Sequence, residues 1–195
     1  MKQILVQFSL LAVLLSLSAC GGVPLRSLPR LMSLQSELLV ANPAEFMVAL
    51  QVDARLVPPA GAVPLLIVKL QPAQAGAFEP IDKKLPLQLS VTSVSTLGLE
   101  PPPTGRRWLI YSLPAPTQAE LLRVQTTIQH AKALPNGQGA GSLSVGVEQD
   151  SLAVTEPALT NTRWDTWLQT RQRDGFFEVW SGTPDQIRKM TAGRK

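Results

Sequence analysis

The sequence predicts a mainly β protein, with an antiparallel, β-sandwich-like domain over residues 31–195, one helix near 117–133 and a short C-terminal helix near 184–191. The proline pattern is the first reason. Twelve of the seventeen prolines lie between Pro43 and Pro116, with no gap longer than fourteen residues, which leaves room for strands and little for helices. Alternation of apolar and polar residues is the second reason, and the confinement of helical patterns to the chain after Pro116 is the third.

Alternation is clearest from Phe46 to Leu56, where apolar residues are interleaved with Gln51, Asp53 and Arg55 in the manner of a half-buried strand. Leu65–Leu70 is apolar except for Lys69, as a central strand would be. Pro101–Gly105 is expected to be a rigid connector. Further strands are expected at residues 87–92, 108–113, 143–147 and 152–155.

Helical spacing begins after Pro116. Thr117 and Glu120 have the spacing of a capping box, in which each side chain satisfies a backbone N–H at a helix start. The apolar residues that follow share one helical face, up to the break at Pro135-Asn136-Gly137. The β-branched run Thr126-Thr127-Ile128 also fits a strand, which is the alternative to the favoured helix. The face consists of Leu121, Val124, Ile128 and Ala131.

A second capping-box spacing, from Thr183 to Gln186, predicts the C-terminal helix. Pro184 would occupy the first helical position, where its missing N–H costs nothing. The basic residues at the end of the chain are expected to be solvated.

Aromatic residues gather near the C-terminus, where five of the ten lie between residues 164 and 180. Asp174-Gly175 is a hairpin turn signal between the stretches TRWDTWLQTR and FFEVW. A hairpin would place Trp164 and Trp167 on opposite faces, because side chains alternate along a strand. A helix would place them on the same face. The hairpin is the favoured interpretation, and the helix is the alternative.

These aromatic side chains have two possible roles. In a protein with few aromatic residues, large rings usually belong to the core. The functional alternative is that Trp167 and Trp180, together with Arg163 and Arg171, form an exposed patch beside Glu178 that binds a partner protein or a glycan. Tryptophan and arginine are enriched where interfaces concentrate binding energy. The four residues are therefore the candidate partner-binding site.

The first twenty residues have the pattern of a processed leader. Lys2 precedes an apolar run over residues 4–17, which is too short to span a bilayer. Leu17-Ser18-Ala19-Cys20 follows, and this motif resembles the lipobox of bacterial lipoproteins. The resemblance implies that residues 1–19 are removed as a signal peptide. It also implies that Cys20, the only cysteine, becomes the first mature residue and carries diacylglycerol and fatty acyl groups such as palmitate.

Location follows from the same resemblance. No Asp comes after Cys20, and in lipoproteins an Asp there often causes retention in the inner membrane. The expected location is therefore the outer membrane, with the domain facing the periplasm. Residues 20–30 are expected to be the acylated cysteine and a short extended tether. The alternative is an ordinary secretory leader cleaved after Ala19.

Composition excludes several function classes. The net charge of +4 falls to +3 without Lys2, which is too small and too scattered for a nucleic-acid surface. One histidine, His130, and one cysteine cannot form the usual metal sites, so neither metal nor cofactor is expected. Glu148 and Asp150 could face the same way and support acid–base work, but exposed acids at a strand end explain them equally well, and no enzyme is predicted. The favoured function is a non-catalytic binding or assembly module for another envelope component, and the alternative is a carrier or sensor of an apolar ligand.

Overall fold

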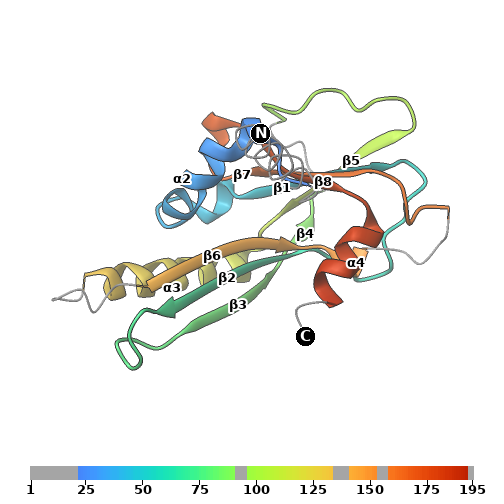
Figure 1. Cartoon of the computed structure of the whole chain (residues 1–195). Coiled ribbons are helices and arrows are strands. Elements are labelled where there is room, and N and C mark those ends of the chain that lie inside the picture. Colours follow the sequence, from blue (N-terminus) through green and yellow to red (C-terminus); the bar gives the residue numbers. More distant parts are fainter. Residues whose placement is uncertain (1–21, 91–95, 134–140, 153–157, 193–195) are drawn as a thin grey trace, which may run out of the picture.

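In the computed structural model, which describes residues 22–90, 96–133, 141–152 and 158–192, the strands form two antiparallel sheets (Figure 1). The first sheet has the strand order β4 (Gln88–Leu89), β5 (Arg106–Ser112), β1 (Met47–Asp53), β7 (Trp164–Gln169) and β8 (Phe177–Gly182). The second has the order β3 (Ile81–Pro86), β2 (Leu65–Pro72) and β6 (Gly141–Glu148). The prediction of a mainly β, antiparallel, sandwich-like domain is confirmed.

The described α-helices contribute side chains to the same apolar core as these two sheets. Figure 1 shows α3 running along the three-stranded sheet, and α2 lying near β1 and β7. No helix in the described ranges is both long and apolar enough to cross a membrane. The α-helices are α2 (Leu28–Leu38), α3 (Ala115–Lys132) and α4 (Pro184–Ala192), and the 3₁₀ turns are η2 (Leu25–Ser27), η3 (Pro43–Glu45), η5 (Asp150–Leu152) and η6 (Gln172–Asp174).

One apolar core joins all of these layers. The inward side chains of β1, Val48, Leu50 and Val52, have no exposed surface, as their alternation predicts. They meet the inward side chains of β2 and β7 and the apolar face of α3. The largest fully buried side chains of the core are Trp164, Tyr111, Phe46, Leu38, Leu50, Leu56, Leu66, Leu87, Leu113, Leu121, Ile128 and Leu152.

The helix predicted near 117–133 is confirmed as α3, and its predicted apolar face is the buried one. The capping box is wrong. The helix begins two residues earlier, at Ala115, because Pro116 has its φ fixed at a helical value in the first turn. Thr117 is therefore buried inside the helix, and Glu120 pairs with Lys83 at 2.8 Å and with Arg123 at 2.6 Å.

The second capping box forms as predicted at the start of α4. The Thr183 N–H donates to Gln186 Oε1 at 2.9 Å, and the Gln186 N–H donates to Thr183 Oγ1 at 3.3 Å. These reciprocal bonds satisfy donors that the first turn would otherwise leave unpaired.

The C-terminal hairpin is confirmed as β7 and β8, but its turn is longer than an Asp-Gly pair. Residues 172–174 form η6, and Gly175 reverses the chain with a φ of 65°. A Cβ at Gly175 would lie 2.6 Å from the Leu97 carbonyl oxygen. Glycine is required there for two reasons, the positive φ and the close backbone.

The expected tether over residues 20–30 is wrong in its described part. Gly22, the first described residue, already belongs to the folded body, because its carbonyl accepts a hydrogen bond from the Ser181 N–H at 2.7 Å. Pro29 lies in the first turn of α2, where proline favours a helix, so it does not mark an extended segment. The last carbonyls of α2 accept hydrogen bonds from Gln125 and Gln129 of α3, which fixes α2 to the body.

Three strand predictions also need correction. The strand expected at 152–155 is contradicted at Leu152, which ends η5, and residues 153–155 lie outside the described residues. The strand expected at 87–92 is reduced to Gln88–Leu89, with residues 91 and 92 outside the described ranges. Strand β3 was not predicted, because Lys83 interrupts the apolar alternation on its inner face and reaches Glu120 instead.

Candidate functional site

The four predicted partner-binding residues are not brought together. Trp167 lies on the face of β7 that points away from the core, and Arg163, which directly precedes β7, reaches Asp165 and Glu178 on the same side. Trp180 lies on the opposite face of the sheet, beside Thr166 and Leu168. Arg171 follows the end of β7 and lines a shallow pocket of its own with Val40, Asn42, Glu45, Gln172 and Arg173.

A β-bulge in strand β8 separates the two tryptophans. Thr166 lies opposite Trp180, whereas the next residue, Trp167, lies opposite Glu178. Val179 is therefore an extra residue in β8 with no partner opposite it on β7. In a regular strand, Glu178 and Trp180 would share a face, because side chains two apart do. The extra residue turns Trp180 toward the core side and leaves Glu178 with Trp167.

Trp167 is the centre of a half-buried group of side chains on the outer face. Its ring meets the Trp108 ring edge to face, with the centroids 6.0 Å apart and the planes at 88°. The Arg26 guanidinium lies 6.0 Å from the Trp167 ring centroid, within range of a cation–π contact. We call the group formed by Arg26, Trp108, Arg163, Trp167 and Glu178 the Trp167 surface.

Glu178 joins the arginines of this surface. Its side chain is only 5% exposed, and it forms an ion pair with Arg26. Arg163 approaches the other carboxylate oxygen at 4.0 Å. A carboxylate that is this buried requires cationic partners, and the hydrogen bond from Arg26 makes Arg26 the closer of the two.

Asp165, the neighbour of this surface on β7, is also buried and paired. It accepts from Arg106 Nη1 at 2.7 Å and from Arg163 Nε at 2.7 Å. Burial works to raise the pKa of Asp165, but hydrogen bonds from Ser181, Arg163 and Arg106 outweigh it, and the pKa lies below its usual value. The bond to Asp165 in turn raises the pKa of Arg163.

This arrangement suits binding better than catalysis. The carboxylates of Asp165 and Glu178 are occupied by arginines, so neither is placed to exchange a proton with a substrate. The arginines themselves remain accessible, because the side chains of Arg26 and Arg163 are 71% and 66% exposed. Fixed guanidinium groups beside two tryptophan rings are the composition of an interface hot spot.

Trp180 contributes to a different feature, a groove of about 610 Å³ along the free edge of β6. Apolar side chains from α2, β6, β8 and α4 make up much of its wall, and Lys69 and Lys84 lie at its polar end. Both lysines are paired, Lys69 with Asp82 and Lys84 with Glu148. The apolar lining consists of Leu31, Leu34, Ile67, Val145, Val147, Leu168, Val179, Trp180 and Ile187.

Two glycines hold the Trp180 ring in this groove. A Cβ at Gly182 would lie 2.3 Å from Trp180 Cζ2, and one at Gly22 would lie 2.5 Å from Trp180 Nε1. Neither position has room for a side chain. The first described residue of the chain, two after Cys20, is therefore packed directly against Trp180.

The polar residues considered for chemistry do not form a cluster. His130 is exposed in the last turn of α3, and Glu148 is bound to Lys84 in the three-stranded sheet. Within the described ranges, no group of three or more His, Cys, Asp or Glu side chains is arranged to hold a metal ion.

The sequence analysis missed Arg26, Trp108 and Arg106 as neighbours of Trp167. Strand β1 lies between β5 and β7, with Trp108 of β5 opposite Gln51 and Trp167 of β7 opposite Ala49. Only this register brings Trp108 next to Trp167. Comparisons of the chain with protein-family models, curated proteins and solved structures found no match.

Proposed function

We propose that this chain is a lipid-anchored envelope lipoprotein whose body is a non-catalytic binding module, and that the Trp167 surface binds a partner protein of the envelope. The lipobox-like motif at Leu17–Cys20 supports the anchor, with Cys20 acylated and the domain held at the outer membrane, facing the periplasm. An unpaired cysteine in an oxidising compartment is otherwise a liability.

The observation that carries the binding role is the Trp167 surface itself. Trp108 and Arg26 contact the Trp167 ring, buried Glu178 holds Arg26, and buried Asp165 holds Arg163. Such a surface loses little side-chain entropy on binding, because its side chains are already held in place. Two tryptophans and two accessible arginines then supply apolar area and donors for acidic or carbonyl groups of a partner.

Site-specific photo-crosslinking in the native envelope tests this role. A photoreactive residue replaces Arg163, which is exposed and lies at the rim of the surface. We expect one defined crosslinked protein, lost when Trp167→Ala is added and retained with Trp167→Phe. Leu122, which is 51% exposed on α3, is the control position. Equal capture at both positions, or capture unaffected by Trp167→Ala, would contradict the proposal.

The groove supports a second candidate function, a carrier or sensor of an apolar ligand. Its volume falls in the range of small-molecule sites, and half of its wall is apolar. Lipid extraction of the purified mature protein, followed by mass spectrometry, should then find a bound apolar molecule in stoichiometric amount. Val147→Trp should fill the groove and reduce that amount. Extracts with no lipid beyond the Cys20 anchor would exclude the carrier.

A further inference from the structure

Exposed apolar side chains are concentrated in the first described residues. Nine large apolar side chains are exposed in the described ranges, and four of them lie between residues 23 and 32. Leu25 and Met32 are the most exposed of the nine, at 82% and 83%. The four residues Val23, Leu25, Leu28 and Met32 are called the apolar strip below.

The strip is a second apolar face on a helix that already has one. Leu34 and Leu38 of α2 are buried in the core, and Ser27 of η2 is buried with them. Leu25, Leu28 and Met32 follow each other at intervals of three and four residues, which is the spacing of one helical face. A helix on the surface of a soluble domain ordinarily has polar residues there, so this face calls for a cover that the described chain does not provide.

The position of Gly22 indicates what covers the apolar strip. Gly22 is fixed by its hydrogen bond to Ser181 and by its contact with Trp180. Cys20 is two residues away, so its Cα lies within about 8 Å of the Gly22 Cα. On the proposed function, acyl chains on Cys20 enter the bilayer from that point, with no tether to separate the body from the lipid.

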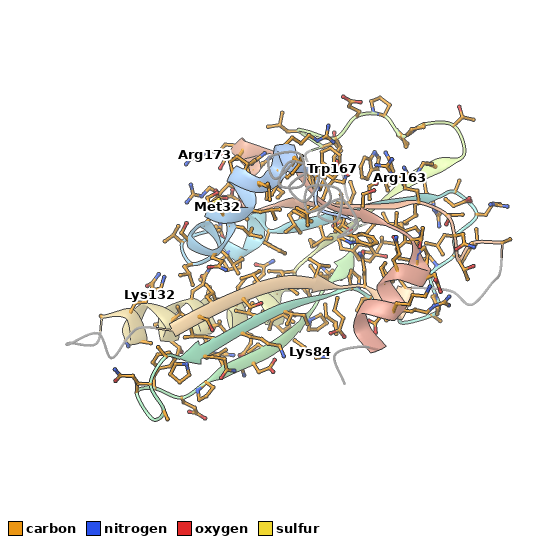
Figure 2. The ribbon with its side chains drawn as sticks, in the orientation of Figure 1. Met32, Lys84, Lys132, Arg163, Trp167 and Arg173 are labelled. Carbon is orange, nitrogen blue, oxygen red and sulfur yellow. The ribbon has the colours of Figure 1, made fainter. Side chains whose placement is uncertain are left out.

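Basic side chains accompany the strip. Arg30 packs over the Phe177 ring at 4.4 Å and donates to the Asp174 carbonyl at 3.0 Å. Arg173, next to Asp174, is 76% exposed. Met32, Arg173, Trp167 and Arg163 all lie in the upper half of Figure 2, whereas Lys84 and Lys132 lie in the lower half. Arginines beside an apolar helix face are the composition of a helix that lies in an anionic headgroup layer.

We infer that the apolar strip lies in the headgroup region of the membrane that holds the Cys20 lipid, with α2 parallel to the bilayer surface. The inference rests on the proposed anchor and adds an orientation to it. Arg26, which follows Leu25 and contacts Trp167, places the Trp167 surface at the edge of this membrane contact. The three-stranded sheet and α3 then face away from the lipid.

Depth-dependent fluorescence quenching tests the orientation. The acylated full-length protein, purified from a host that processes lipoproteins, is reconstituted in vesicles of phosphatidylethanolamine and phosphatidylglycerol. A Met32→Cys variant carries an NBD fluorophore at residue 32, and a Leu122→Cys variant carries it on α3 as the matched exposed control. We expect a blue shift of the emission at residue 32 and its loss with nitroxide-labelled lipids, and neither at residue 122.

The outcomes separate the inference from the proposal on which it rests. Labelling of the wild-type protein would show a free Cys20 thiol, which contradicts the anchor. With Cys20 blocked, an aqueous emission at residue 32, or one equal to that at residue 122, would overturn the orientation. A blue shift that nitroxide lipids do not quench would mean that protein covers the strip, which also overturns it.

Discussion

Trp164 and Trp167 are three residues apart on strand β7, and they lie on faces of the five-stranded sheet that are stabilised in different ways. Trp164 has no exposed surface and packs in the apolar core. Trp167 is partly exposed and is held by a ring edge and a guanidinium group. One face therefore depends on burial of apolar area, and the other on charge pairs and oriented contacts.

The comparison explains why the outer face is suited to the proposed binding role. A side chain of the core face cannot turn outward to contact a partner, because it would leave a destabilising cavity behind it. On the outer face, buried Asp165 holds Arg106 and Arg163, and buried Glu178 holds Arg26, which lies over the Trp167 ring. Order is maintained there without complete burial, so the surface is both fixed and accessible.

The largest expected effect comes from removing the buried ring. Trp164→Ala should lower the free energy of unfolding by about 3–5 kcal/mol, because a cavity replaces a fully buried indole. Trp167→Ala should lower it by only about 1–2 kcal/mol, the sum of a ring–ring contact and a cation–π contact. Urea denaturation of both variants measures the two values. Equal losses would mean that the two faces contribute to stability in the same way.

Asp165→Asn is expected to have the second largest effect, because it removes a buried charge from two arginines. The variant should lose about 2–4 kcal/mol of unfolding free energy, since Arg106 keeps only neutral acceptors in a mostly buried position. Asp82→Asn is the matched control. Its ion pair with Lys69 is 2.8 Å long, but both side chains are about half exposed, so the loss should be below about 1 kcal/mol.

The pH dependence of this effect has a defined sign. The folded-state pKa of Asp165 lies below its usual value, so its contribution to stability is complete above the unfolded pKa of about 4. The contribution is lost as the pH falls from there through the folded pKa. The stability difference between wild type and Asp165→Asn should therefore shrink as the pH falls below about 4. A difference that stays constant over this range would show that Asp165 acts through shape alone.

Local patterns in the sequence were sufficient to predict much of the fold. The alternation in β1, the apolar face of α3 and the box at Thr183 each depend on residues that are neighbours along the chain. Where prediction failed, a longer-range contact decided the structure. Lys83 sits on the inner face of β3 because Glu120 of α3 is there to pair with it. The leucines of α2 are helical against the core, although Pro24 and Pro29 favoured an extended segment.

The candidate site was predictable only in part, for the same reason. Trp167 and Arg163 were found from composition, and the structure places them on one face. Trp180 was grouped with them because nothing local marks the bulge at Val179. Arg26 and Trp108 are 141 and 59 residues away from Trp167 along the chain. A pattern within a short segment of the sequence could not have predicted that the three residues are in contact.

The third effect, which should weaken both faces together, is expected at the turn that joins β7 to β8. Gly175→Ala should lower the unfolding free energy by about 2–3 kcal/mol, because an alanine at a φ of 65° is strained and its Cβ would meet the Leu97 carbonyl oxygen. Gly61→Ala separates the two causes. Gly61 has a similar φ of 76° with no atom within 4 Å of a Cβ, so it should lose only about 1 kcal/mol. If thermal unfolding shifts equally in the two variants, the close approach of Leu97 contributes nothing, and the hairpin does not depend on the segment that packs against its turn.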